Sequence, residues 1–573
     1  MQRALLRLLV PAIGAALAIG GTLGPAAAAG PTDWPQWGQN PQHQGFVDVA
    51  GQSLNNVLAD LTYDPNVPAE QAASGGDLLA HYQAPLLHQG DMFMEFKSGP
   101  FTDPDHWSSQ TWSERRYHFE NGSFVEKWEH QTDWKPEPNG PGNGQSSKQD
   151  RLGLGGWEPV FHAVLANGFV YVPDAGGTIT KLATGDGSVV SRVDPGYPQS
   201  ANTTTFVAGP LSADSSGNVY FNAIQLDNVQ PWGADYTTDI PDSWLVKVGP
   251  DDTAHKVSYK SLVVGAPTTC TTTYNTTTDV PWPNFTTTPP TGPCGSQRVG
   301  LNVAPAIAPG GTIYSVSRAH FRSRYSYLLA VNPDLTQKWQ ASLRGHLDDG
   351  CGVLLPNDNG GRKGIGCRKG SPTGVDPATN ESPAGRVIDQ TSSSPTVAPD
   401  GSILYGSYSR YNFARGHLWK FSPMGQLSAT FDFGWDSTPA IFPHGGTYSI
   451  VIKDNHYDAN CCPTNNAPPP GPFFITQLSS SLAIEWQFKS TTIVQPDNPN
   501  GFEWCINAPA IDTNGVVYAN SEDGNVYAIN QGGTLKQKKF LRIAIGAAYT
   551  PLAIGADGKL YTENDGHLFV LGN

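Results

Sequence analysis

Charged side chains are scarce in this chain of 573 residues, because Asp, Glu, Lys and Arg together make up only 15%. Gly (63) and Pro (48) are abundant instead, which disfavours long helices and suits many short strands joined by turns. The 35 basic residues against 50 acidic ones give a net charge of −15. An acidic surface repels phosphate backbones, so nucleic acid is excluded as an expected partner.

Cysteine is also sparse: there are seven, and none lies in a C-x-x-C pair. This absence argues against a zinc ribbon and against a covalently attached c-type haem. Two pairs of cysteines each lie at the two ends of one inserted loop, which predicts the local disulfides Cys270–Cys294 and Cys351–Cys367. The third predicted pair is Cys462–Cys505. Its neighbour Cys461 leaves two alternatives open: a vicinal bridge between Cys461 and Cys462, or pairing of Cys461 in place of Cys462.

Long hydrophobic runs are missing except at the N-terminus. Arg3 and Arg7 precede the largely apolar stretch 8–23, and the small residues 26–30 offer cleavage positions. This pattern predicts a secretory signal peptide over residues 1–29, with a membrane anchor as the lesser alternative. We expect residues 30–573 to form one domain that is secreted to the periplasm or the extracellular medium as a monomer, with no stable membrane insertion after signal removal.

A short phrase recurs eight times: Ala-Pro or a variant, then a short apolar strand and a Gly turn. The copies begin at Ala84, Glu158, Gly209, Ala304, Ser394, Thr438, Ala508 and Thr550. The best copies continue into a unit of four short strands, here named A to D from the channel outward. A four-stranded unit repeated around an axis is the signature of a β-propeller. The sequence therefore predicts an all-β, eight-bladed propeller of antiparallel blades, with seven blades as the alternative.

The two chain ends are predicted to close the ring. The last unit ends at residues 568–573 without its strand D, whereas the first unit is already complete near Trp128. Residues 54–63 are left over and can supply the missing strand, which would remove an exposed sheet edge.

The long insertions are predicted to lie on a single face. The A–B and C–D turns are tight, whereas the D–A connections 130–156, 251–302, 344–392 and 489–506 and several B–C connections are long. Alternating strand direction places all D–A and B–C connections on one face, which we call the loop-rich face. Long loops on a rigid scaffold commonly carry function, so this face is the expected ligand-binding surface.

The phrase L-x-A-(V/I)-N-P-x-x-x-x-x-W in strands C and D resembles the repeat of quinoprotein-type propellers, and residues 33–45 resemble the opening segment of such proteins. That family includes pyrroloquinoline-quinone (PQQ) dehydrogenases and non-catalytic propellers. The resemblance implies an eight-bladed funnel whose loop-rich face can hold PQQ with Ca²⁺. The family's A-x-D/N-x-x-T-G-x-x-x-W repeat is largely absent, and the closest copy, at residues 183–191, lacks the Trp.

Residues just before strand A and just after strand B should line the mouth of the channel. With neighbouring loop residues they give the candidate ligand-binding set: His81, Trp157, Asn302, Arg318, His320, Arg410, Tyr411, Asp436, Asp454, His456, Asn507, Glu522 and Tyr549. Asp454 and His456 carry metal-ligating groups, but a solvated acidic loop is the simpler interpretation, so no metal site is predicted. No catalytic residue can be assigned.

Two basic clusters, residues 318–325 and 410–417, fall in equivalent B–C loops. Positive charge in an acidic protein suits a carboxylate or sulfate ligand, and the alternative is that these arginines pair with nearby carboxylates. The favoured function is binding of an extracellular small molecule, polysaccharide or protein. The alternatives are a PQQ/Ca²⁺-dependent dehydrogenase of alcohols or sugars and, by analogy alone, a polysaccharide lyase.

Overall fold

The computed structural model describes part of the chain. The described residues are 33–73, 82–101, 109–136, 160–198, 204–227, 240–274, 283–347, 375–376, 379–389, 393–408, 416–433, 437–455, 473–489, 502, 504, 506–543 and 551–573. The expected signal segment, residues 1–29, lies outside them. Within them, no helix is both long and apolar enough to cross a membrane.

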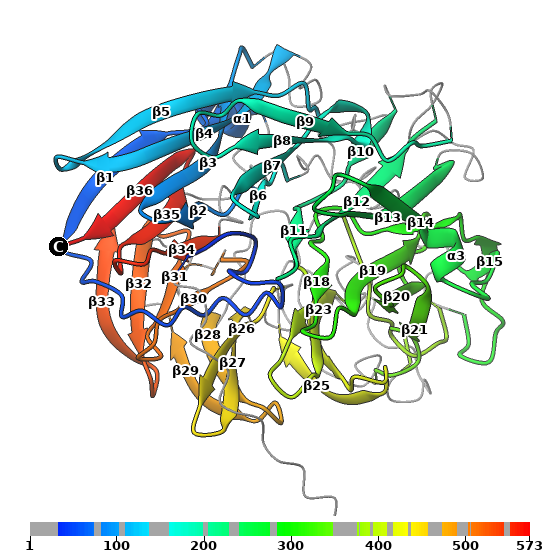
Figure 1. Cartoon of the computed structure of the whole chain (residues 1–573). Helices are drawn as coiled ribbons and strands as arrows, with labels where there is room; N and C mark the ends of the chain where they lie inside the picture. The colour runs from blue at the N-terminus through cyan, green and yellow to red at the C-terminus, as the bar shows by residue number, and fades with distance from the viewer. Residues whose placement is uncertain are drawn as a thin grey trace, which may run out of the picture.

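Eight antiparallel sheets follow one another around a central axis, so the eight-bladed prediction is confirmed (Figure 1). Blade 1 contains β2 (Leu86–His88), β3 (Asp91–Ser98), β4 (Thr111–Glu120) and β5 (Ser123–Gln131). Blade 2 contains β6 (Val164–Ala166), β7 (Phe169–Pro173), β8 (Ile179–Ala183) and β9 (Val189–Val193). Blade 5 contains β22 (Thr396–Val397), β23 (Ile403–Tyr408), β24 (Gly416–Phe421) and β25 (Leu427–Phe433).

Blades 6 and 7 have the same four-stranded order. Blade 6 contains β26 (Ala440–His444), β27 (Thr447–Asn455), β28 (Phe473–Ser479) and β29 (Ile484–Lys489). Blade 7 contains β30 (Ala510–Ile511), β31 (Val517–Asn520), β32 (Asn525–Asn530) and β33 (Thr534–Phe540).

In blades 3 and 4 the inner strand is split into two pieces, both paired with strand B. Blade 3 contains β10 (Thr205–Val207), β11 (Ser212–Ala213), β12 (Val219–Gln225), β13 (Asp242–Val248) and β14 (Ala254–Ser258). Blade 4 contains β17 (Gln297–Val299), β18 (Ala306–Ile307), β19 (Ile313–Ala319), β20 (Ser326–Val331) and β21 (Gln337–Ser342). The extra pieces β10 and β17 extend the inner edge toward the loop-rich face.

The N-terminal strand closes the ring as predicted. Blade 8 contains β34 (Leu552–Ile554), β35 (Leu560–Asn564) and β36 (His567–Gly572), and β1 (Asn56–Thr62) pairs antiparallel with β36 as its outer strand. The described helices are α1 (Val67–Ala73), α3 (Tyr259–Leu262) and a 3-10 turn at Ala175–Gly177. This pairing covers the edge of β36 and gives blade 8 four strands like its neighbours.

Indole rings join neighbouring blades. The Trp128 indole of blade 1 donates to Thr184 O of blade 2 (2.9 Å), and the Trp339 indole of blade 4 donates to Pro423 O of blade 5 (3.0 Å). Each ring covers a glycine of that turn: a Cβ on Gly187 would lie 2.7 Å from Trp128, and one on Gly425 2.6 Å from Trp339. The repeated Trp is therefore a blade-to-blade contact, as its place in the repeat favours.

Residues 33–52, here called the strap, cross the inner strands of all eight blades in order. The strap forms hydrogen bonds with at least one residue of each blade, among them Leu87, Leu165, Ala213, Ile307, Val397, Ile441, Ile511 and Gly558. Glutamine side chains of the strap also bind the backbone of the inner strands. Gln36 both donates to Ala213 O and accepts from Ala213 N, and Gln42 and Gln44 donate to Ile307 O and Val397 O. Gly45 is required, because its φ is +61° and a Cβ would lie 2.7 Å from Pro509 O.

The strap lies at the face of the tight A–B turns and fills the axis there. Trp37 is buried with Ala304 and Ala508, and its ring meets His162 edge-on at 5.6 Å. His43 donates from Nδ1 to Pro395 O (2.9 Å), and its Nε2 faces the Ser212 hydroxyl (3.4 Å). Burial lowers the pKa of His43 to about 4, so this imidazole is neutral. The loop-rich face is therefore the end of the channel that the strap does not cover.

Candidate ligand site on the loop-rich face

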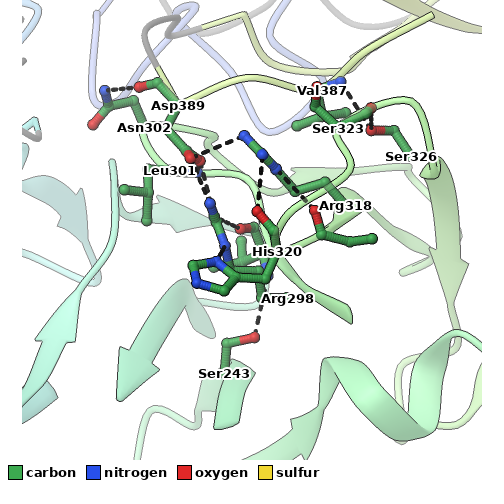
Figure 2. Close-up of polar contacts among 12 residues, drawn as sticks. Ser243, Arg298, Leu301, Asn302, Arg318, His320, Ser323, Ser326, Val387 and Asp389 are labelled. Carbon is green, nitrogen blue, oxygen red and sulfur yellow. Dashed lines mark hydrogen bonds and ion pairs between the residues drawn. The ribbon is translucent and has the colours of Figure 1, made fainter. Parts of the chain in front are cut away.

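Six of the predicted site residues belong to the described part of the chain: Asn302, Arg318, His320, Asp454, Asn507 and Glu522. The other seven lie outside it: His81, Trp157, Arg410, Tyr411, Asp436, His456 and Tyr549. Asn302, Arg318 and His320 come together in one buried cluster. We call Arg298, Arg318, His320 and Asp389 the arginine cluster (Figure 2).

The two arginines of this cluster face each other across a strand pair. Arg298 of β17 lies directly opposite Arg318 of β19 in the antiparallel register. Like charges in directly opposed positions repel, so the pair requires a negative partner. Asp389, which comes from the connection between blades 4 and 5, supplies that partner.

The Asp389 carboxylate accepts four hydrogen bonds. Arg298 binds it through both terminal nitrogens, Nη1 to Oδ1 (2.9 Å) and Nη2 to Oδ2 (2.5 Å). Arg318 Nη1 donates to Oδ2 (3.1 Å), and the Leu301 backbone N–H donates to Oδ1 (3.0 Å). Burial alone would raise the pKa of Asp389, but the two guanidinium groups outweigh it and hold this pKa below its usual value.

Arg318 makes fewer charged contacts than Arg298. Its remaining hydrogen bonds go from Nε to Ala319 O (3.3 Å) and from Nη2 to His320 O (3.1 Å), both of which are neutral acceptors. Burial lowers the pKa of Arg318 to about 10, and repulsion by Arg298 adds to the decrease while Asp389 opposes it. Two guanidinium groups thus share one carboxylate, which leaves one positive charge in excess.

His320 is a neutral member of the cluster. Its Nδ1 accepts a hydrogen bond from Arg298 Nε (3.1 Å). Burial lowers the pKa of His320 well below its usual value, and the charges of Arg298 and Arg318 lower it further. This imidazole therefore adds no positive charge to the cluster.

Asn302 ties the cluster to the inner ring. Its backbone is left-handed (φ +60°), its Oδ1 accepts from Val160 N (2.9 Å), and its Nδ2 donates to Asp389 O (3.2 Å). The side chain is 1% exposed. In this structure Asn302 joins the connections that precede blades 2 and 5.

The other described candidates are spread over blades 6 and 7. Asp454 is buried and accepts from the Thr476 hydroxyl (2.7 Å) and from Gln487 Nε2 (3.2 Å). Asn507 is buried and accepts from the Thr438 hydroxyl (3.0 Å). Glu522 is half-buried after β31. The structure does not bring these three residues to the arginine cluster.

Two insertions interlock beside the cluster. The Cys270–Cys294 disulfide is confirmed and closes the insertion that holds β15 (Thr269–Thr271) and β16 (Thr291–Pro293). Glu381 of the next insertion accepts from the Thr271 hydroxyl (2.7 Å) and from Arg344 (2.7 Å). The Arg344 guanidinium lies 3.7 Å from the Tyr325 ring centroid. The other predicted pairs, Cys351–Cys367 and Cys462–Cys505 (or a vicinal Cys461–Cys462 bridge), fall outside the described residues.

A second buried charged group lies at blades 1 and 8 and has the opposite sign. Lys97 donates to Glu70 (2.7 Å) and Asp64 (3.3 Å), and all three side chains are at most 5% exposed. Burial raises the pKa of Glu114 to about 8, and burial also raises the pKa of Glu563 well above its usual value. These five residues share burial rather than direct contact throughout, and we call them together the carboxyl cluster.

Sequence reasoning missed Arg298 and Asp389. Both lie in long D–A connections, and 91 positions separate them along the chain. The available signal was their placement: Arg298 and Asp389 each come a few residues before a strand A, in two successive units. Only the fold brings these connections into contact.

The quinoprotein resemblance implies PQQ with Ca²⁺, and the described residues do not fit that group. No three carboxylate, imidazole or thiolate groups among them converge as metal ligands. Arg298 is bound to Asp389 through both terminal nitrogens, so this cluster offers at most one cation to the carboxylates of the quinone. We therefore derive no reaction step through PQQ.

Comparison with known proteins identifies the fold. No family profile matches the chain, and no curated protein matches it. Among solved structures, a europium-containing methanol dehydrogenase aligns with a TM-score of 0.52 and 10% identity over 92% of this chain and 89% of the other. Quinohemoprotein alcohol dehydrogenase from Comamonas testosteroni aligns with a TM-score of 0.51 and 10% identity, over 95% of this chain and 81% of the other. BamB from Moraxella catarrhalis aligns with a TM-score of 0.41 and 10% identity, over 90% of this chain and 99% of the other. At 10% identity, the two alignments with TM-scores above 0.5 show the β-propeller fold and nothing finer.

Proposed function

We propose that this chain is an exported binding propeller that holds an extracellular glycan, polymer or protein on its loop-rich face. The mature protein would consist of residues 30–573. In this proposal the eight blades act as a rigid support, and the insertions on one face supply the contacts. No redox cofactor is part of the proposal.

The observation that carries the proposal is the interlocking of the two insertions around blade 4. Glu381 accepts from Thr271 of the disulfide-closed insertion and from Arg344 of its own connection, and Asn380 Nδ2 donates to the Tyr274 hydroxyl (2.7 Å) of the disulfide-closed insertion. Loops held in place before binding lose less conformational entropy when a ligand arrives. Such cross-bonding suits a recognition surface.

A binding assay with purified residues 30–573 tests the proposal. The probes are alginate, polygalacturonate and a neutral cellulose oligosaccharide, followed by an array of extracellular proteins. We expect saturable binding to at least one probe without chemical change to it. Glu381→Ala should weaken that binding by about tenfold or more, because it releases both insertions. Glu126→Ala, which removes a carboxylate from the outer strand of blade 1, should leave it unchanged.

Two further assays test the alternative functions. Dye-linked oxidation of alcohols or sugars after loading with PQQ and Ca²⁺ would replace the binding proposal by a dehydrogenase. Conversion of either acidic polysaccharide into unsaturated products would replace it by a lyase. Absence of binding to every probe, with the fold intact, would also contradict the proposal.

A further inference from the structure

The arginine cluster contains a buried charge imbalance that nothing in the described structure compensates. Arg298 and Arg318 carry two positive charges, Asp389 carries one negative charge, and His320 is neutral. The side chains of both arginines are at most 2% exposed. Buried charges are normally paired, and a guanidinium cannot relieve the imbalance by losing its proton near neutral pH.

The imbalance is located on Arg318. Arg298 grips Asp389 with two nitrogens, whereas Arg318 reaches the same carboxylate with Nη1 alone. The rest of Arg318 faces the carbonyl oxygens of Ala319 and His320. Each terminal nitrogen of a guanidinium carries two N–H groups, so Nη1 and Nη2 of Arg318 each retain one donor beyond these bonds.

The cluster is buried on the side of the blades that carries the long connections. Arg298 lies in β17 and Arg318 lies near the end of β19, both in blade 4, and Asp389 belongs to the connection before blade 5. All three positions are on the loop-rich side of the blades. Figure 2 shows the three side chains converging from these separate segments.

We propose that Arg318, beside the Arg298–Asp389 pair, is an anion-binding site that takes a carboxylate or sulfate group of the ligand. The proposal deepens the proposed function by naming the chemistry of the ligand, and it rests on that function only for the identity of the larger molecule. A planar guanidinium with two free donors suits an oxyanion, and the bound anion would complete the charge balance of the cluster. Because the site is buried, binding should stabilise the folded protein.

Thermal unfolding in the presence of small anions tests the site without knowledge of the ligand. The probes are sodium glucuronate for a uronate carboxylate and sodium sulfate for a sulfate ester, each against sodium chloride at equal ionic strength. We expect a saturable rise of several degrees in the unfolding midpoint with at least one probe. The probe with the lower half-saturation concentration identifies the group.

Three variants separate this site from general salt effects. Arg318→Gln removes the excess charge and leaves the Arg298–Asp389 pair, so the saturable rise should disappear. Arg318→Lys keeps the charge and should retain a rise with weaker half-saturation. Arg192→Gln, which removes one charge from an exposed pair with Asp133, is the matched control and should behave like the parent protein.

Two results would overturn the proposal: a parent protein whose midpoint follows ionic strength alone, or a saturable rise that survives in Arg318→Gln. If Arg318→Gln does not fold, a rise in Arg318→Lys with weaker half-saturation than in Arg192→Gln supports the site, and an unchanged half-saturation rejects it. Neither result depends on polysaccharide binding. Failure of the anion site is therefore distinguishable from failure of the binding function.

Discussion

The arginine cluster and the carboxyl cluster both bury ionisable side chains, but the first is rich in basic groups and the second in acidic groups. In a ring of eight blades, blades 4 and 5 lie opposite blades 8 and 1, as Figure 1 shows for β19 and β3. Both clusters are buried near the loop-rich ends of their blades. At blade 4 the charges persist, because arginine keeps its proton and Asp389 is held ionised. At blade 1 burial moves Glu114 toward its neutral form at ordinary pH.

The two clusters therefore differ in whether their buried groups can change their charge by gaining or losing a proton. A buried carboxyl group can take up a proton when its partner is removed, which limits the free-energy cost. A buried guanidinium keeps its positive charge at ordinary pH values, so it requires an anionic partner. In our proposal ligand recognition belongs to the arginine cluster, and we expect the carboxyl cluster to make stability depend on pH.

The largest expected effect follows removal of the shared counter-ion at blade 4. Asp389→Ala leaves two opposed guanidinium groups without a carboxylate and should lower the free energy of unfolding by about 3–5 kcal/mol. Because guanidinium groups in general stay protonated at such pH values, the loss should be the same from about pH 5.5 to 8.5. Urea unfolding at several pH values measures it. Glu129→Ala, which removes a more exposed partner of Arg115, should cost less than about 1 kcal/mol.

A second effect concerns the pH dependence at blade 1. The pKa of Glu114 rises from 4.5 to about 8 on folding, so the folded state holds a proton that the unfolded state has released. Stability should therefore fall as pH rises from about 4.5 to about 8. Glu114→Gln cannot lose that proton, and its stability should exceed that of the parent by up to about 4 kcal/mol at pH 8.5. Parallel pH profiles for both proteins would contradict the assignment.

The smallest expected effect comes from removing the cation at blade 1. Lys97→Met leaves Asp64 and Glu70 without their shared ammonium group, and burial already raises the pKa of Glu70. Glu70 can take up a proton in this variant, so the loss should be about 2 kcal/mol near pH 8 and less than about 1 kcal/mol near pH 5. A loss as large and as pH-independent as that of Asp389→Ala would remove the distinction between the two clusters.

The fold was predictable because its signals are local and repeated. The eight Pro-strand-Gly phrases set the number of blades, and the missing fourth strand of the last unit pointed to residues 54–63, of which Asn56–Thr62 pair with β36. Cys270–Cys294 followed from bracketing of one loop. Each of these inferences uses residues close in sequence or a pattern repeated along it.

The site was only partly predictable, because its chemistry depends on contacts between distant segments. Arg318 and His320 stood out as a basic cluster, but their partners Arg298 and Asp389 carry no motif. The course of the strap was also hidden, since it bonds mainly to backbone groups, which every sequence supplies. Burial decides the charge states of Glu114 and His43, and burial is a property of the assembled ring.

Diffraction from crystals of residues 30–573 grown with sodium selenate tests the central claim most directly. Selenium gives an anomalous signal that locates the anion without reference to the protein. The account predicts one well-occupied peak within hydrogen-bonding distance of Arg318 Nη1 or Nη2, beside the Arg298–Asp389 pair, and no such peak in Arg318→Gln. Selenate confined to exposed lysines and arginines, with Arg318 unoccupied, would contradict it.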